Sequence, residues 1–225
     1  QQVAIEPTRE EGQRQLMRGL ALGGERNAAL AQYEACRRVL AEELQVGRLL
    51  TSLPAGHELL ALPLAQQPCR DGEHWEWDGV RFELLHPAAG DAERYRKSND
   101  LSCVLRVAAA GRSALLTSDI EARAEAALLA RHGQGLAADV LLVPHHGSRT
   151  SSSPDFVAAV GARETIFPVG YRNRFGHPKA EVLARYDGTR QWRSDRDGAV
   201  SVHLGAAGVT IATERAERRR YWHGS

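Results

Sequence analysis

The hydrophobic positions in the middle of the chain follow a strand, helix, strand order. Apolar runs at 114–116 and 140–143 each lead into a polar cluster, Thr117 to Asp119 and His145 to Ser148. The segment between them, 120–132, is rich in Ala, Leu, Glu and Arg, which favour helices. In a unit with parallel strands, both polar clusters fall at the same edge of the sheet. The pattern therefore predicts one rim that carries an aspartate and two histidines.

Other patterns predict a mixed sheet around this unit. Apolar side chains alternate on both sides of Asp78-Gly79, which predicts a β-hairpin over 73–85 with a type I′ turn. Further strands are expected at 101–108, 113–116, 165–169, 191–193, 199–204 and 209–212, the last closing the sheet, and short helices at 154–161 and 178–187. Hairpins mixed with β-α-β crossovers indicate the α/β (α+β) class, as a sandwich.

The first 46 residues have a different character. Two apolar-striped segments separated by Gly23-Gly24 predict a helical hairpin, and the helical pattern ends at Val46 to Arg48. The expected domains are 1–46 and 47–225. Leu20 and the run YEACRRVLAEEL resemble a tetratricopeptide-like repeat of bacterial transcriptional activators, although only one repeat is present.

Composition adds a few limits. The formal net charge of +1 argues neither for nor against a nucleic-acid partner, and the basic run at 215–220 reads as a solvated tail. The three cysteines, Cys36, Cys69 and Cys103, are odd in number and form no CxxC, which predicts reduced thiols rather than a disulfide framework. No apolar run approaches the roughly 20 residues that span a bilayer, so we expect a soluble chain.

The candidate metal ligands are Asp119, His145 and His146. By position alone, Asp119 reads as a helix N-cap, and its pairing with the two histidines favours a ligand. Neighbouring side chains on an extended segment point in opposite directions, so we expect only one of the two histidines to face a given metal. The alternative is two solvated loop histidines.

The loop 171–178 is the candidate phosphate site. Arg172, Asn173 and His177 are expected there, with Arg174, as donors to a substrate phosphate. Considered alone, His177 reads as a loop histidine near a helix start. Further substrate contacts are expected from Asn99 and from Ser148. The remaining histidines lack a partner pattern and are expected to be structural or exposed.

Four motifs together carry a family resemblance. They are SNDLSCVL, LLTSDIE, ADVLLVPHHGSRTSSSPDF and GYRNRFGHPKAEVLARY. In this order they resemble the C-terminal metallo-β-lactamase-like domain of ComEC-type DNA-uptake competence proteins, from about Arg48 to the C-terminus. The resemblance implies an αββα sandwich, with Asp119 bridging two metal ions (Zn or Mn) and His145 or His146 completing the site. It also implies phosphodiester hydrolysis of single-stranded DNA, a membrane channel as partner, and a bacterial inner-membrane setting.

The chain also departs from that family. The HxHxDH cluster that supplies most ligands of the first metal is absent before Asp119, so no general base is identified. The domain is thus expected to be a partial sandwich that lacks its first half. Ser118 stands where the family has glycine, and Ala180 where it has proline. Three hypotheses follow: a metal-dependent nuclease of DNA uptake, a non-catalytic DNA- or partner-binding remnant acting through 172–177, and a regulatory interaction protein acting through its N-terminal helical hairpin.

Overall fold

The computed structural model describes residues 47–54, 56–61 and 63–218. The predicted helical hairpin of residues 1–46 lies outside the described residues, and the domain division at 46/47 stays a prediction. The chain divides into two compact units, 1–49 with 62–66, and 50–61 with 67–225. The second unit holds the main sheet and all of the candidate site residues.

Two strands near the start form a small sheet. β1 (Arg48–Thr51) pairs with β2 (Ala65–Pro68), and a short 3₁₀ helix, η1 (Glu58–Ala61), lies between them in sequence.

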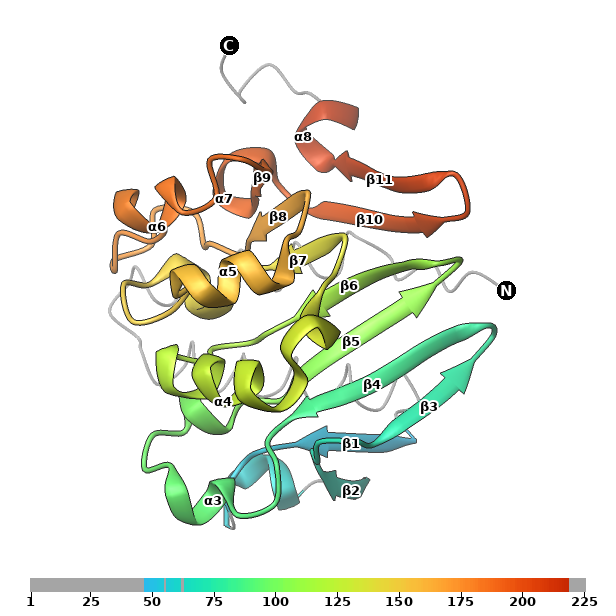
Figure 1. Ribbon diagram of the computed structural model, residues 1–225, viewed down its shortest axis with the longest axis vertical. Helices are drawn as coiled ribbons and strands as arrows, with labels where there is room; N and C mark the ends of the chain where they lie inside the picture. The colour runs from blue at the N-terminus through green and yellow to red at the C-terminus, as the bar shows by residue number, and fades with distance from the viewer. Residues whose placement is uncertain (1–46, 55, 62, 219–225) are drawn as a thin grey trace, which may run out of the picture. The chain divides into compact units, whose positions relative to one another are not determined.

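The main sheet has seven strands in the order of the sequence (Figure 1). They are β3 (His74–Trp77), β4 (Val80–His86), β5 (Val104–Ala109), β6 (Arg112–Leu116), β7 (Val140–Leu142), β8 (Glu164–Phe167) and β9 (Arg190–Arg193). Strands β3 to β6 pair antiparallel, and β6 to β9 pair parallel. The mixture of hairpins and crossovers confirms the predicted α/β class.

The first hairpin has the turn that its sequence predicts. Asp78 and Gly79 have φ of 49° and 77°, and a type I′ turn requires positive φ at both central positions. The turn sets the register Trp77 to Val80, which places Trp75 opposite Phe82 with ring centroids 5.2 Å apart.

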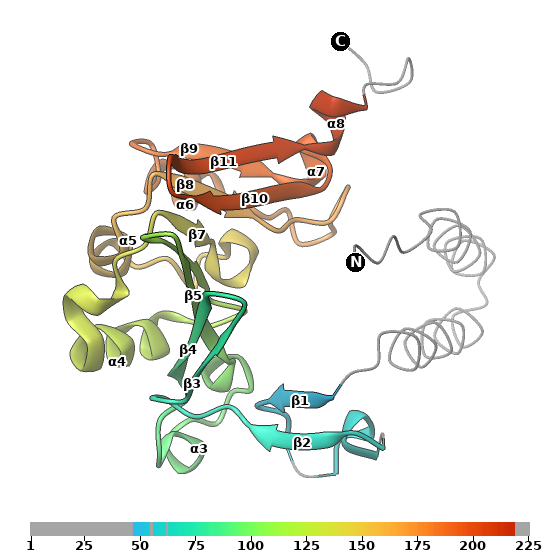
Figure 2. The same cartoon turned by 90° about the vertical axis from the view of Figure 1, so that its right-hand side faces the viewer.

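Helices cover one face of the sheet (Figure 2). The larger ones are α4 (Ala122–His132), α5 (Pro154–Val160) and α6 (Ala180–Ala184). The main core lies beneath them, where Leu115 and Phe167 of the sheet pack with Leu128 of α4 and Phe156 of α5, all fully buried. The remaining short helices are α3 (Asp91–Arg94), η2 (Asn99–Leu101), η3 (Gly133–Leu136), η4 (Pro144–Gly147), α7 (Ser194–Asp197) and α8 (Glu214–Glu217).

The sequence pattern predicted that the last strand closes the main sheet, and this prediction is wrong. β10 (Val200–Gly205) and β11 (Gly208–Thr213) form a separate antiparallel pair. Val200, Leu204 and Val209 pack with Ala114, Val140, Ile166 and Trp192 of the main sheet in a second core cluster. By covering this cluster, the hairpin removes apolar side chains of the main sheet from water.

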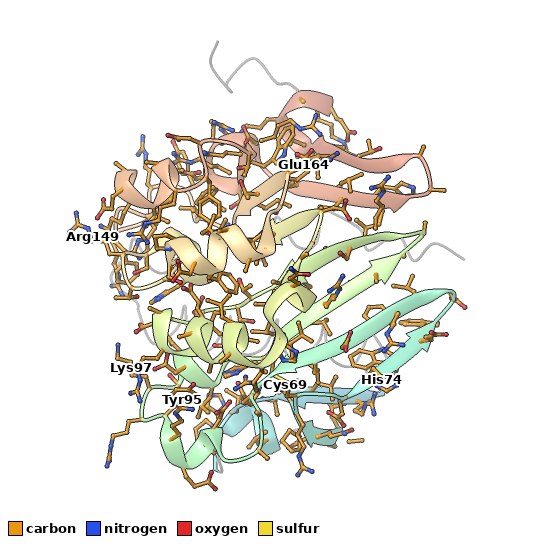
Figure 3. The ribbon with its side chains drawn as sticks, viewed as in Figure 1. Cys69, His74, Tyr95, Lys97, Arg149 and Glu164 are labelled. Carbon is orange, nitrogen blue, oxygen red and sulfur yellow. A yellow bond between two sulfur atoms is a disulfide. The ribbon has the colours of Figure 1, made fainter. Side chains whose placement is uncertain are left out.

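The prediction of reduced cysteines is wrong for two of the three. Cys69 and Cys103 form a disulfide, with Cα atoms 5.9 Å apart. The two cysteines are 34 residues apart in sequence, so their spacing gave no sign of the bond. Cys69 follows β2 and Cys103 precedes β5, and the β3–β4 hairpin brings the two segments together. Figure 3 labels Cys69.

None of the helices in the described part of the chain combines the length and the apolar character needed to cross a membrane.

Candidate functional site

The predicted rim forms where β6 and β7 end. These strands are parallel neighbours with Leu116 beside Leu142. Beyond them, the hydroxyl of Thr117 donates to the Leu142 carbonyl over 2.6 Å, and the backbone N–H of His145 donates to the Ser118 carbonyl over 3.0 Å. The acidic tip and the histidine tip are therefore joined directly.

The histidine tip is a tight turn. His145, His146 and Gly147 have φ of 49°, 57° and 78°, so three consecutive residues lie in the left-handed region. Gly147 is required there, because a Cβ would lie 2.6 Å from that of Pro178. The segment is therefore not extended, although an extended one was assumed from the sequence, and the expectation that only one of the two histidines faces a given metal stays a prediction. Both rings face acidic groups of the rim.

His146 faces Asp119. Its Nδ1 lies 2.7 Å from the carbonyl oxygen of Pro168, which places the ring proton on Nδ1. The lone pair of Nε2 is then available, and this atom lies 3.4 Å from Oδ1 of Asp119. A backbone carbonyl that fixes the imidazole in this way is the usual support of a metal-binding histidine.

His145 is held on both of its ring nitrogens. Its Nε2 lies 3.5 Å from the amide nitrogen of Asn99, and its Nδ1 lies 3.2 Å from the hydroxyl of Thr150 and 3.6 Å from Oε1 of Glu121. Asn99 thus reaches the rim, as expected. The sequence pattern did not predict Glu121 as a rim residue, because it placed this residue inside a helix. The motif LLTSDIE, in which Glu121 stands two residues after Asp119, could have indicated it.

Asp119 is not a helix N-cap. Helix α4 begins at Ala122, its N-cap is Glu121, and no side chain caps it. The preceding residue, Ser118, has φ of 50°. This left-handed conformation is the physical reason why glycine suits the position, and Ser118 adopts it while its hydroxyl donates to the Cys103 carbonyl over 2.9 Å.

The loop 170–178 lies next to the histidine tip. The side-chain amide of Asn173 donates to the His177 carbonyl over 2.8 Å and accepts from the His177 N–H over 2.9 Å. The ring of His177 lies 6.2 Å from that of His145, and its Nδ1 is buried without a hydrogen-bond partner. Burial lowers the pKa of His177, and the positive charge of Lys179 lowers it further.

Other predicted site residues have internal partners or lie at the surface. Ser148 is buried, and its hydroxyl lies 3.2 Å from that of Thr150. The guanidinium groups of Arg172 and Arg174 lie over the rings of Tyr171 and Phe175, at 5.3 and 4.9 Å from the centroids.

A buried polar cluster holds the segment 148–153 in place by hydrogen bonds. The Glu125 carboxylate accepts from the backbone N–H of Ser152 and of Ser153, the latter over 2.8 Å. Arg185 donates to the carbonyls of Ser151 and Ser152, and the hydroxyl of Tyr186 donates to that of Ser152 over 2.9 Å. The cluster fixes the residues that follow the histidine tip, including Thr150.

The rim offers two of the donors that a metal site needs. Within residues 47–218, apart from the undescribed 55 and 62, no group of three or more His, Cys, Asp and Glu side chains is placed to hold a metal ion. Asp119 and His146 are of the right chemical type, but a catalytic zinc takes three protein ligands. The described residues therefore do not fit a complete catalytic metal site.

Together, the sheet, the helices on one of its faces and the rim define a mixed α/β domain, the class that the sequence pattern predicts. The chain is 38% identical over 156 residues to "Competence protein ComA" of Neisseria gonorrhoeae, covering 67% of this chain and 21% of that protein. It is 30% identical over 139 residues to "ComE operon protein 3" of Bacillus subtilis, covering 61% of this chain and 17% of the relative. The predicted resemblance is confirmed: about two thirds of the chain is related to bacterial competence proteins, and it spans about a fifth of their length.

The chain is also similar to one family model and to two solved structures. Residues 1–55 match the family model of the bacterial transcriptional activator domain, in agreement with the resemblance noted for the N-terminal segment. A putative zinc-dependent hydrolase of the metallo-β-lactamase superfamily from Thermotoga maritima is 14% identical, with a TM-score of 0.35, over 65% of this chain and 79% of that one. The diiron β-hydroxylase CmlA from Streptomyces venezuelae is also 14% identical, with a TM-score of 0.42, over 75% and 40% of the two chains.

Proposed function

We propose that this domain serves DNA internalisation during competence by binding the phosphodiester backbone of DNA at the rim. Asp119 and His146 supply two donors of a partial metal site there. The observation that carries the proposal is the 3.4 Å approach of His146 Nε2 to Asp119 Oδ1, with the opposite ring nitrogen fixed by the Pro168 carbonyl.

Cationic side chains around the rim support the phosphate-binding part. Lys97 pairs with Glu121 at 2.6 Å, and Arg149 pairs with Glu181. Both project from the same side of the molecule, on the left in Figure 3. Glu121 and Glu181 compensate these two charges, whereas no ion pair of the described residues joins Arg172 or Arg174 of the neighbouring loop to a carboxylate; the net charge of the whole chain is +1. Binding through such contacts releases counterions and weakens as salt rises.

The purified chain is expected to bind DNA without cleaving it, because two donors fall short of a catalytic set. Fluorescence anisotropy with a labelled single strand measures binding, and elemental analysis measures bound Zn and Mn. We expect Asp119→Ala and His146→Ala to lose the metal that the wild type retains, and His203→Ala, at an exposed position of β10, to keep it. A wild type that binds no DNA at low salt sinks the DNA-binding proposal, and one that retains neither metal sinks the partial metal site.

Hydrolysis is the second candidate function, and it requires metal ligands beyond the Asp119–His146 pair. Its test is incubation of a single-stranded oligonucleotide with the chain and added Zn or Mn. Cleavage that depends on metal and disappears in Asp119→Ala establishes a nuclease. Absence of cleavage by a metal-loaded chain leaves binding as the function.

The disulfide supports a location for the domain. Disulfides form and persist in oxidising compartments, so we place the domain on the outer side of the bacterial inner membrane, next to a membrane channel as partner. A cysteine-reactive reagent that cannot cross the membrane would test this in cells. An outward-facing domain reacts at a cysteine introduced at exposed Ser201, and a cytoplasmic one does not. Regulatory binding through the helical hairpin of residues 1–46 stays a separate prediction.

A further inference from the structure

Two exposed aromatic side chains occupy the loop beside the rim. Tyr171 and Phe175 are each 61% exposed, and they are two of the four large hydrophobic residues that are exposed in the described part of the chain. We infer that Tyr171 and Phe175 form a base-stacking platform, so that this site takes nucleic acid with unpaired bases. The inference rests on the proposed function and adds how the bases, rather than the phosphates, are held.

Each aromatic ring is paired with an arginine. The guanidinium of Arg172 lies 5.3 Å from the centroid of Tyr171, and that of Arg174 lies 4.9 Å from the centroid of Phe175. No carboxylate of the described chain pairs with either arginine. Alternating rings and uncompensated guanidinium groups offer flat surfaces to bases and positive charge to phosphates, the combination that single-strand binding proteins use.

The loop is built in advance of any ligand. Asn173 closes it with two hydrogen bonds to the backbone of His177, and the amino group of Lys179 donates to the Phe175 carbonyl over 2.6 Å. Gly176, with φ of 63°, permits the turn between Phe175 and His177. Because these bonds already hold the backbone around the platform, little conformational entropy is lost on binding.

A continuous series of rings links the platform to the rim. Phe175 stacks on His177 with centroids 5.9 Å apart and planes inclined by 20°. His177 lies 6.2 Å from His145, which in turn lies 6.4 Å from His146. Phe175 is thus two ring contacts away from His145, which places the platform beside the rim.

The platform discriminates between single and double strands for a physical reason. A base can stack on a protein ring only when one of its faces is open, and in a duplex both faces are covered by neighbouring bases. Loss of one stacking aromatic weakens single-strand binding by on the order of tenfold. Removing the two arginines instead weakens binding to any nucleic acid, through the lost charge.

The test uses a single strand and an abasic strand of equal length and charge, with a duplex of the same length, which carries two phosphate backbones, as the third probe. We expect the wild type to bind the single strand at least tenfold more tightly than the abasic strand. The Tyr171→Ala/Phe175→Ala variant should lose this difference and keep its affinity for the abasic strand. Tyr171→Phe/Phe175→Tyr should restore it, since both rings are retained. Trp77→Ala, which removes an exposed aromatic side chain from β3, is the matched control and should change nothing.

The outcomes separate the two proposals. Equal binding of the single and abasic strands by the wild type overturns the platform and leaves phosphate binding intact. Failure of the wild type to bind any of the three probes overturns the proposed function itself. An unchanged preference for bases in the double alanine variant, with thermal unfolding like that of the wild type, also overturns the platform.

Discussion

The backbone N–H of His145 donates a hydrogen bond to the carbonyl of Ser118 over 3.0 Å, and both residues have positive φ, 49° and 50°. This bond joins the two tips that follow β6 and β7. The rim therefore depends on backbone geometry that is unfavourable for residues other than glycine, stabilised by contacts between the tips.

Ser118 offers a direct test of that geometry. Ser118→Ala removes the hydrogen bond to the Cys103 carbonyl and keeps the strained backbone, so we expect the free energy of unfolding to fall by about 0.5–1 kcal/mol. Ser118→Gly loses the same bond but relieves a strain of about 1 kcal/mol, and should be close to neutral. Urea unfolding of both variants checks this. If alanine is tolerated better than glycine, the strain argument fails.

Glu125 is expected to be a structural residue that positions the rim. Burial raises the pKa of its carboxyl, while its hydrogen bonds with Ser152 and Ser153 oppose that shift. Glu125→Ala leaves two backbone N–H groups without an acceptor and should cost about 2–4 kcal/mol. Glu125→Gln keeps one acceptor oxygen and should cost less, and Glu93→Ala, at an exposed site in α3, should cost nothing measurable. Chemical denaturation compares all three, and equal losses in the alanine variants would refute the role.

His86 predicts a dependence of stability on pH. Burial lowers the pKa of the His86 imidazole, and the charges of Asp91 and Asp71 oppose this shift. The imidazole Nε2 lies 2.7 Å from the Asp100 carbonyl, and the Arg131 guanidinium lies 2.9 Å from Nδ1. Below about pH 6.5 the unfolded chain takes up a proton that folded His86 resists. The free energy of unfolding contributed by this group therefore falls as the pH is lowered, by up to about 1.4 kcal/mol per unit.

The measurement is urea unfolding at pH 7.5 and pH 5.5. We expect His86→Gln, whose amide can still donate to Asp100, to lose less stability between these two values than the wild type. His74→Gln, at an exposed site on β3, serves as the control. An unchanged difference in His86→Gln would show that other groups carry the dependence.

Local patterns predicted the parts of the fold that depend on neighbouring residues. The turn at Asp78-Gly79 and the run from β6 through α4 to β7 are fixed by conformational preference and apolar spacing, and both are present. The placement of β10 and β11 was not predictable in this way. It depends on which apolar surface of the sheet remains uncovered, as does the meeting of Cys69 and Cys103.

The sequence pattern predicted which residues meet at the rim but not the detailed geometry of the rim. Parallel strands place Asp119 and the histidines on one rim, so their proximity follows from the sequence pattern. The left-handed turn at His145 and His146 does not, since neither residue is a glycine. Glu121 was missed for a related reason: the helix begins later than its residue types indicate, which leaves this carboxylate at the rim.

The disulfide gives a further prediction, which a thiol count can test first. With Cys69 and Cys103 bonded, the denatured, unreduced chain should react with one equivalent of a thiol reagent, through Cys36, and with three equivalents after reduction. Closing a loop of this length restricts the unfolded chain, so Cys69→Ala/Cys103→Ala should lower the free energy of unfolding by about 4 kcal/mol. Cys36→Ala is the matched control and should leave the effect of reductant on stability unchanged.

The disulfide should also affect the rim. Because Cys103 positions the carbonyl that accepts from Ser118, loss of the disulfide should weaken metal retention by Asp119. Three reactive thiols before reduction would contradict the disulfide and remove the basis for placing the domain in an oxidising compartment.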